Sequence, residues 1–217
     1  MRAIGVFPND FGLIGITKET PWDSPSEEAE NICRFLREKA LDIIHIRKPE
    51  ATNDYAFSLL NSIPQEFHHR LVLHSNFELL NDFNLGGFHD KSNVLQKFTS
   101  FARKPGTIVS KSCHSFDEIC HKDKFTYSYF FLSPFFDSIS KQDYKARFDL
   151  EDPALETINS KYPLIALGGI KPEHLEKLYA FKFAGAALLG YLWSPKSGIE
   201  DKIHHLKEAR KNLINHK

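Results

Sequence analysis

Short apolar runs alternate with helix-like stretches along almost the whole chain, and this alternation limits the fold more than any other feature. Between the runs, apolar residues recur at helical spacing, as in residues 24–40, where Ser24 and several acidic residues stand at the start as they do in many helices. The runs that we interpret as strands are residues 11–17, 41–47, 70–74, 86–89, 106–110, 127–132, 163–169 and 184–190. Such a pattern is typical of repeated βα units and predicts an α/β fold with a parallel sheet.

About eight βα units predict a closed (β/α)₈ TIM barrel. The runs are apolar on both faces, as expected of strands covered by helices on one side and by a packed interior on the other. An open, doubly wound sheet is the alternative, because the same units would also build one. No Pro/Gly/Ser-rich linker divides the sequence, so we expect residues 1–217 to form a single domain.

The charge and the apolar content of the chain limit its partners. Its 28 basic and 28 acidic side chains cancel, so it lacks the positive field that attracts nucleic acid or an anionic membrane, and a small ligand fits better. The sequence has no run of about 18 apolar residues that would span a membrane, and Pro8, Asn9 and Asp10 interrupt the apolar residues near its start. Three cysteines argue against a disulfide framework, so we expect a cytoplasmic protein, with the oligomeric state left open.

Polar side chains stand at the ends of the predicted strands, where barrels of this kind have their active sites. In chain order they are His45, Arg47, Lys48, His74, Ser75, His89, Asp90, Ser110, Lys111 and Ser112. The guanidinium of an arginine at such a position suits a phosphate, although arginines also pair with carboxylates. Each histidine is a candidate acid or base, or a polar filler of the barrel mouth.

Glycines end the seventh and eighth apolar runs. Gly168 and Gly169 directly precede a helix-like stretch, and Gly190 follows the eighth strand. Main-chain N–H groups without a neighbouring Cβ receive anions well, and the loops after these two strands hold phosphate in many barrels. The pair of loops therefore predicts a phosphate site. The alternative is that Gly168 and Gly169 only make a tight turn.

The stretch LSPFFDSISK, residues 132–141, begins as the end of a strand and becomes polar. In a loop over the barrel mouth, the hydroxyls of Ser138 and Ser140 and the ammonium group of Lys141 would bind the oxygens of a phosphorylated ligand. The alternative is a solvated loop with an exposed lysine.

Several segments together resemble the thiamine phosphate synthase family, which also contains a thiazole tautomerase. Residues 133–141 are similar to the family's G-P-x-F-P-T-x-T-K, with serine in place of both threonines. Residues 45–49 resemble its Q-x-R-x-K, residues 110–112 its G-x-S, and residues 166–170, ALGGI, its A-x-G-G-I. The resemblance covers nearly the whole chain.

This resemblance implies an enzyme that joins a pyrimidine carrying a methylene pyrophosphate to a thiazole phosphate and releases pyrophosphate. A departing pyrophosphate accumulates negative charge, which calls for a cationic clamp and usually for Mg²⁺. The catalytic residues that the resemblance implies are Arg47, Ser112 and Lys141. Those implied for binding the two substrates also include His45, Lys48, His74, Ser138, Ser140, Gly168, Gly169, Leu189 and Gly190.

The sequence departs from the family pattern where the metal is expected. The second basic residue of Q-x-R-x-K falls on Pro49, with only Lys48 beside it, and the glutamine position is His45. His74 and Ser75 stand where the family has Asn-Asp. Asp90 is then the remaining candidate ligand for Mg²⁺, an ion that prefers carboxylate and water oxygens. Two alternatives follow: a thiazole phosphate tautomerase, or a barrel that binds phosphorylated ligands without catalysis.

Overall fold

All eight predicted strands are present, and they close into one parallel barrel. The computed structural model describes residues 7, 11–91, 104–120, 126–137 and 146–215. The strands are β1 (Gly12–Ile16), β2 (Ile43–Ile46), β3 (Leu71–Leu73), β4 (Gly87–Asp90), β5 (Ile108–Cys113), β6 (Tyr129–Leu132), β7 (Leu164–Ala166) and β8 (Gly185–Leu188). Each strand pairs in parallel with its neighbours in sequence, and β8 pairs with β1. The predicted (β/α)₈ barrel is therefore confirmed, and the open sheet is excluded.

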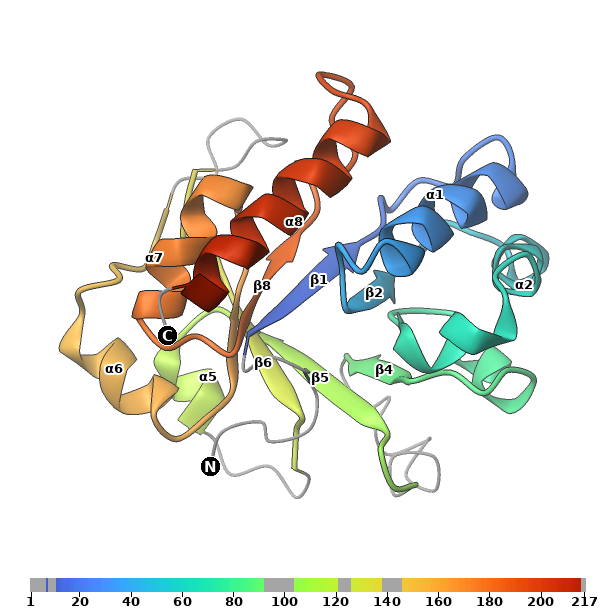
Figure 1. Ribbon diagram of the computed structural model, residues 1–217. Helices are drawn as coiled ribbons and strands as arrows, with labels where there is room; N and C mark the ends of the chain where they lie inside the picture. Colours follow the sequence, from blue (N-terminus) through green and yellow to red (C-terminus); the bar gives the residue numbers. More distant parts are fainter. Residues whose placement is uncertain (1–6, 8–10, 92–103, 121–125, 138–145, 216–217) are drawn as a thin grey trace.

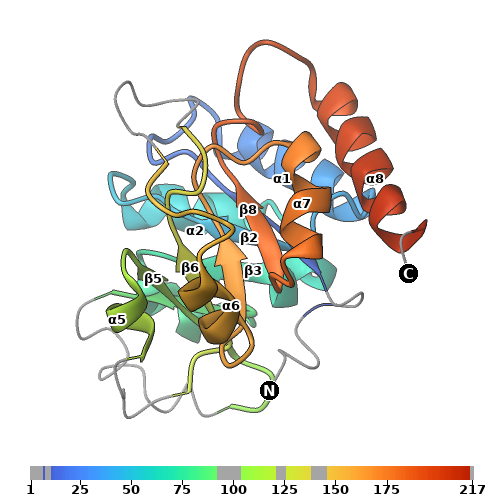
Figure 2. The ribbon, with the colours of Figure 1, turned by 90° about the vertical axis from the view of Figure 1, so that its left-hand side faces the viewer.

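Helices surround the strands on the outside (Figures 1 and 2). The α-helices are α1 (Pro25–Arg37), α2 (Asn53–Asn61), α5 (Phe116–Cys120), α6 (Pro153–Asn159), α7 (Leu175–Ala180) and α8 (Ile199–Asn215). Short 3₁₀ helices add η1 (Gln65–Arg70), η2 (Phe77–Asn81) and η3 (Pro172–His174). The stretch between β3 and β4 thus contains only a 3₁₀ helix. Within the described residues, no helix combines the length and apolar character that crossing a membrane requires.

Helix α1 shows how local sequence fixes an element. The hydroxyl of Ser24 accepts a hydrogen bond from the amide of Glu27 at 3.3 Å, which caps the helix, and Glu27 and Glu28 lie in its positively polarised first turn. Its apolar face, which includes Ile32 and Phe35, is buried against the barrel. The helix predicted from residues 24–40 is confirmed.

The barrel interior changes from apolar to polar along its axis. Inward-facing residues such as Ile14, Ile43 and Val72 form one apolar cluster, while a larger cluster fills the space between the sheet and the helices. Toward the carboxyl ends of β2 to β5 the inward positions become polar. There the buried residues include His45, His74, His89 and Ser110.

Strand β5 is longer than predicted. It continues to Cys113 because both of its neighbours extend beside it: Asp90 pairs with Lys111 and Leu132 pairs with Cys113. Lys111 and Ser112 therefore lie within the strand, beyond its predicted end at residue 110. Since alternate side chains of a strand face opposite sides, Ser110 and Ser112 point inward and Lys111 points outward.

Candidate active site at the barrel mouth

The alternation of side chains along each strand decides which predicted residues meet at the barrel mouth. On β2, the ring of His45 points inward to contact Phe131 and His74, whereas Ile46 belongs to the outer cluster. Continuing the alternation places Arg47 on the inner side and Lys48 on the outer side. On β4 the same rule places His89 inside and Asp90 outside, because Phe88 packs in the outer cluster.

Three histidines from adjacent strands form a buried hydrogen-bonded cluster. Nδ1 of His45 lies 2.7 Å from Nε2 of His74, and Nε2 of His45 lies 2.6 Å from the hydroxyl of Tyr129. The rings of His74 and His89 stack with centroids 4.1 Å apart. At the far end of the cluster, Nδ1 and Nε2 of His89 contact Ser110 and Ser112 at 2.9 and 3.0 Å. We refer to His45, His74 and His89 as the histidine cluster.

The histidine cluster is electrically neutral at physiological pH. Burial lowers the pKa of His45 and of His74 well below the ordinary value, and the neighbouring histidines lower both further. Burial, together with the positive charges of Lys91 and Arg47, lowers the pKa of His89 to about 3. Burial also raises the pKa of Tyr129, so that its hydroxyl keeps its proton. The cluster therefore consists of neutral imidazoles.

Arg47 lies at the rim above the histidine cluster. Its guanidinium forms an ion pair with Glu19 at 2.7 Å, and its side chain is 31% exposed. Its amide donates to the hydroxyl of Thr17 at 2.8 Å, which ties the end of β2 to the end of β1. Lys91, directly after β4, is near enough that Arg47 lowers its pKa in addition to the effect of burial. Two cations and one carboxylate thus face the same rim.

Lys48 faces α1 on the outer side of the sheet. Its ammonium group lies 2.7 Å from a carboxylate oxygen of Glu28 on α1, with both side chains 0% exposed, and it donates to the carbonyl oxygen of Thr20 at 2.9 Å. The other oxygen of Glu28 accepts from the hydroxyl of Tyr55 at 2.7 Å. This placement corrects the prediction that Lys48 binds substrate. The side chain instead holds the loop after β1, which carries Glu19.

Asp90, the predicted magnesium ligand, is turned away from the barrel interior. Its carboxylate accepts a hydrogen bond from the hydroxyl of Tyr127 at 2.7 Å, on the outer side of the sheet. At the positions where the family has Asn-Asp, the described structure offers the imidazole of His74 and the hydroxyl of Ser75. Mg²⁺ prefers oxygen ligands and carboxylates above all. The described residues therefore do not fit a magnesium site, and the assignment of Asp90 is corrected.

The loops after β7 and β8 present main-chain amides, as predicted. Gly168 and Gly169 have φ angles of 95° and 66°, and a Cβ on Gly169 would lie 2.3 Å from the carbonyl oxygen of Asp137. In the described part of the chain, the amides of Gly168, Gly169 and Gly190 have no hydrogen-bond acceptor. The indole of Trp193 donates to the carbonyl oxygen of Ile16 at 2.7 Å, which is the oxygen that the register would otherwise pair with the amide of Gly190. These free donors suit an anion.

The remaining predicted residues divide into two groups. Ser112 lies inside the barrel and contacts His89, and half-buried Leu189 begins the loop after β8. Ser138, Ser140 and Lys141 lie outside the described residues, so their predicted roles stay predictions.

Sequence reasoning missed Tyr129, Lys91 and Glu19, and it named Ser110 without its role. Tyr129 was hidden in an apolar run, although its inward position follows from strand alternation, and the role of Ser110 in holding His89 depends on the β4–β5 register. Lys91 stands one residue beyond the polar residues considered after β4. Glu19 lies in the loop after β1, and no pattern in the sequence links it to Arg47.

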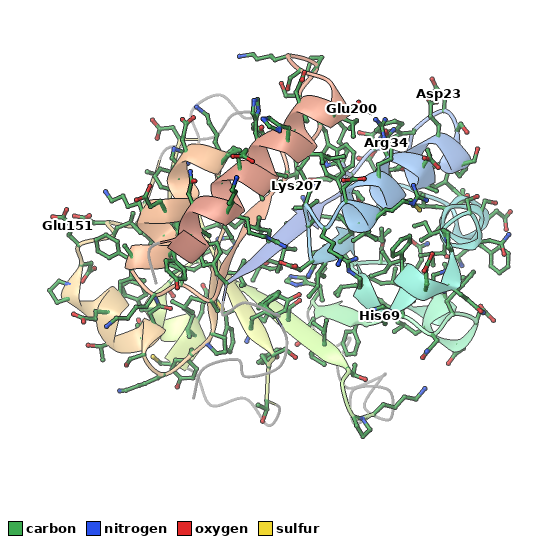
Figure 3. All side chains as sticks on the ribbon, viewed as in Figure 1. Asp23, Arg34, His69, Glu151, Glu200 and Lys207 are labelled. Carbon is green, nitrogen blue, oxygen red and sulfur yellow. The ribbon has the colours of Figure 1, made fainter. Side chains whose placement is uncertain are left out.

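A hollow lies on the outer surface, between α1 and α8. It has a volume of about 520 Å³ and is lined mainly by charged side chains. Arg34 pairs there with Glu200 (Figure 3), and Lys207 pairs with Glu38 at 2.8 Å. Because these charges already neutralise one another on the outside of the helices, the barrel mouth is the better candidate site.

Known proteins resemble this chain in architecture and in sequence. Residues 13–192 match the family model described as thiamine monophosphate synthase. The chain is 32% identical to thiamine phosphate pyrophosphorylase from Bacteroides thetaiotaomicron, whose crystal structure aligns over 94% of this chain and 98% of that chain with a TM-score of 0.70. A thiamine phosphate pyrophosphorylase from Pyrococcus furiosus, 16% identical with a TM-score of 0.71, shares the fold.

Curated relatives agree with this assignment. The chain is 26% identical to the thiamine-phosphate synthase of Latilactobacillus sakei subsp. sakei (strain 23K) over 148 residues, which are 67% of this chain and 65% of that protein. The match thus spans slightly less than two thirds of that relative. The thiamine-phosphate synthase of Flavobacterium psychrophilum is 23% identical over 177 residues. The barrel, the glycine loops and these matches together show that the chain belongs to the thiamine monophosphate synthase family.

Proposed function

We propose that this protein is a transferase that couples hydroxymethylpyrimidine pyrophosphate to thiazole phosphate, giving thiamine phosphate and pyrophosphate. The observation that carries the proposal is the arrangement of the rim. Main-chain amides after β7 and β8, which have no acceptor among the residues that the structure describes, offer one anion site, and Arg47 with Lys91 offers positive charge near β2 and β4. Two anionic substrates need two such places. Family membership and the relatives named as thiamine phosphate synthases support the same reaction.

Arg47 is proposed to receive the pyrophosphate of the pyrimidine substrate. Its guanidinium stays charged and presents several N–H donors in a plane, which matches phosphate oxygens. In the structure, Glu19 pairs with one of its terminal nitrogens at 2.7 Å. Since the pair is partly exposed and such pairs are weak, an incoming pyrophosphate competes with Glu19 for the guanidinium. The charge that accumulates on the leaving pyrophosphate is then stabilised by Arg47, and Lys141 is proposed to act with it.

The amides of Gly168, Gly169 and Gly190 are proposed to hold the thiazole phosphate. Both glycines after β7 have φ angles in the left-handed region, which aims their N–H groups in directions that other residues rarely allow. Amides in such loops bind a phosphate without a side chain, so the thiazole ring would be held with little freedom to turn. The hydroxyl of Ser112, fixed by His89 at 3.0 Å, is proposed as a further hydrogen-bonding group in the cavity.

Pyrophosphate release tests the proposal directly. Purified protein is incubated with both substrates, and pyrophosphate and thiamine phosphate are measured, with and without added Mg²⁺. Release that requires both substrates is expected. If no pyrophosphate is released while thiazole phosphate still raises the melting temperature, the protein is a binder that does not catalyse the coupling. Conversion of one thiazole phosphate tautomer into the other, without coupling, would instead identify a tautomerase.

The Arg47→Ala variant tests the assignment of the two anion sites. We expect its affinity for pyrophosphate to fall by about tenfold or more, the loss of one charged hydrogen-bonding group, while its affinity for thiazole phosphate changes much less. Isothermal titration with each ligand separately measures both. Equal losses for the two ligands would show that the sites are assigned to the wrong sides of the rim.

The location of the protein stays part of the proposal. The three cysteines Cys33, Cys113 and Cys120 form no disulfide with one another. Free thiols are typical of a reducing compartment, which supports the proposed cytoplasmic location.

A further inference from the structure

The histidine cluster is built from groups that bind transition metals. Among the described residues, one group of three potential metal ligands converges: His45, His74 and His89, with all three candidate nitrogen atoms within 4.8 Å of one another. They come from β2, β3 and β4, three consecutive strands, at the inward positions near the carboxyl ends. All three side chains are buried, so bulk water has little access to their ring nitrogens and competes weakly with a metal ion for them.

We propose that His45, His74 and His89 form a site for one divalent transition-metal ion of the zinc or cobalt class. Imidazole nitrogen is a preferred ligand for these metals, whereas Mg²⁺ takes oxygen ligands. Three histidines with a fourth position left for water or another ligand are a common arrangement for a protein-bound zinc ion. The inference does not depend on the proposed coupling reaction, because it concerns binding alone.

Hydrogen bonds already orient two of the three rings for this role. Nε2 of His45 is held by the hydroxyl of Tyr129 at 2.6 Å, which leaves Nδ1 to face His74. Nδ1 of His89 is held by Ser110 at 2.9 Å, which leaves Nε2 for the metal. Protein ligands are typically supported in this way, with the second ring nitrogen bonded to a neighbouring polar group.

Metal binding requires each of the three rings to move. Zinc–nitrogen bonds of about 2.0–2.1 Å in a tetrahedron place the nitrogen atoms about 3.4 Å apart. His45 and His74 at 2.7 Å must separate slightly, and His89 must approach from within 4.8 Å. Because a lone pair lies in the plane of its ring, the stacked rings of His74 and His89 must also turn out of their parallel arrangement. Ser112 then exchanges its contact with Nε2 of His89 for a place nearer the rim.

Cobalt titration is the direct experiment. Untagged protein is stripped with a chelator and titrated with Co²⁺, whose visible absorption reports nitrogen coordination in a four-coordinate site. One equivalent per chain is expected to bind, Zn²⁺ is expected to displace it, and excess Mg²⁺ is not. Absence of a stoichiometric absorption change in the wild-type protein overturns the proposal, whatever its activity with the two substrates.

Variants separate this site from the surface histidines. His74→Asn is expected to abolish the absorption change, and Tyr129→Phe to weaken Co²⁺ binding by about 10–100-fold, the usual cost of losing the group that orients a ligand. The control is the double variant His204→Asn/His205→Asn, which removes two exposed histidines of α8 and is expected to bind Co²⁺ normally. Binding that persists in His74→Asn, or that is lost in the control, overturns the proposal. Circular dichroism spectra establish that each variant is folded.

Discussion

The two halves of the barrel mouth are built in different ways. On the β7–β8 side the proposed site consists of main chain, and the amides of Gly168, Gly169 and Gly190 have no acceptor among the described residues. On the β2–β5 side it consists of side chains that hold one another, from Ser112 through His89 to the rest of the histidine cluster. A site made of main chain depends on local conformation, and a pair of glycines in the sequence indicates that conformation. A side-chain site depends on which residues of different strands face each other.

The largest expected effect concerns β2, where neighbouring residues face opposite sides. Lys48→Met keeps the length of the side chain but leaves the buried carboxylate of Glu28 without its partner. Removing one member of a buried ion pair costs about 3–5 kcal/mol of the free energy of unfolding. Urea denaturation measures this cost.

Arg47→Met is the matched control for that variant. Its ion pair with Glu19 is partly exposed, so the loss of stability is expected to stay within about 1 kcal/mol. Equal costs for the two variants would contradict the assignment of Lys48 to the framework and Arg47 to the ligand side. The double variant Lys48→Met/Glu28→Gln should recover part of the loss, because the uncompensated charge is then absent.

The next largest effect is expected on the main-chain side. Gly169→Ala places a Cβ 2.3 Å from the carbonyl oxygen of Asp137 at a φ of 66°. Backbone strain of this kind costs about 1–3 kcal/mol, and the shift that relieves the contact should also weaken phosphate binding. Both are measured on the same variant, by urea denaturation and by titration with inorganic phosphate.

Gly106→Ala separates the effect of a positive φ angle from the effect of a close Cβ contact. Gly106 has a φ of 82°, but a Cβ there would meet nothing within 4 Å. Its replacement is expected to lower stability modestly and to leave phosphate binding unchanged. If Gly169→Ala behaves in the same way, the loop after β7 is a simple turn rather than part of the anion site.

The difference between main-chain and side-chain sites also explains which features could be predicted from the sequence. The strand positions and the closed barrel follow from patterns within short segments, and the structure confirms both. The glycine loops follow from such a pattern too, and their role as an anion site stays a prediction. Lys48 and Asp90 were misplaced because a strand end seemed polar on both faces, and only the register and the partners Glu28 and Tyr127 reveal the outward side. The contact between Arg47 and Glu19 joins two loops, and nothing local in the sequence records it.

The smallest expected effect, taken per histidine and per pH unit, is the pH dependence of the free energy of unfolding that the histidine cluster causes. The folded protein holds its histidine cluster neutral, with the pKa of His89 at about 3, whereas the unfolded chain takes up protons near the ordinary histidine pKa of 6.5. The unfolded state therefore binds more protons as the pH falls, and the free energy of unfolding should decrease below about pH 6.5, by up to about 1.4 kcal/mol per pH unit for each histidine. Above that pH the contribution of the cluster is constant.

Urea denaturation of the wild type and of His89→Asn isolates the contribution of His89 to this pH dependence. The measurements run from about pH 7.5 to about pH 5, a range that includes the ordinary histidine pKa. The variant lacks one of the protons that unfolding takes up, so its stability should fall less steeply with decreasing pH, by about 1.4 kcal/mol per unit. Carboxylates and the histidines outside the cluster titrate in both proteins and cancel in the difference. Burial, the largest cause of the low pKa of His45 and of His74, acts in both proteins. Parallel pH profiles would mean that His89 is protonated in the folded protein. The side-chain half of the rim would then carry positive charge of its own, and the contrast with the uncharged amides opposite would have to be drawn differently.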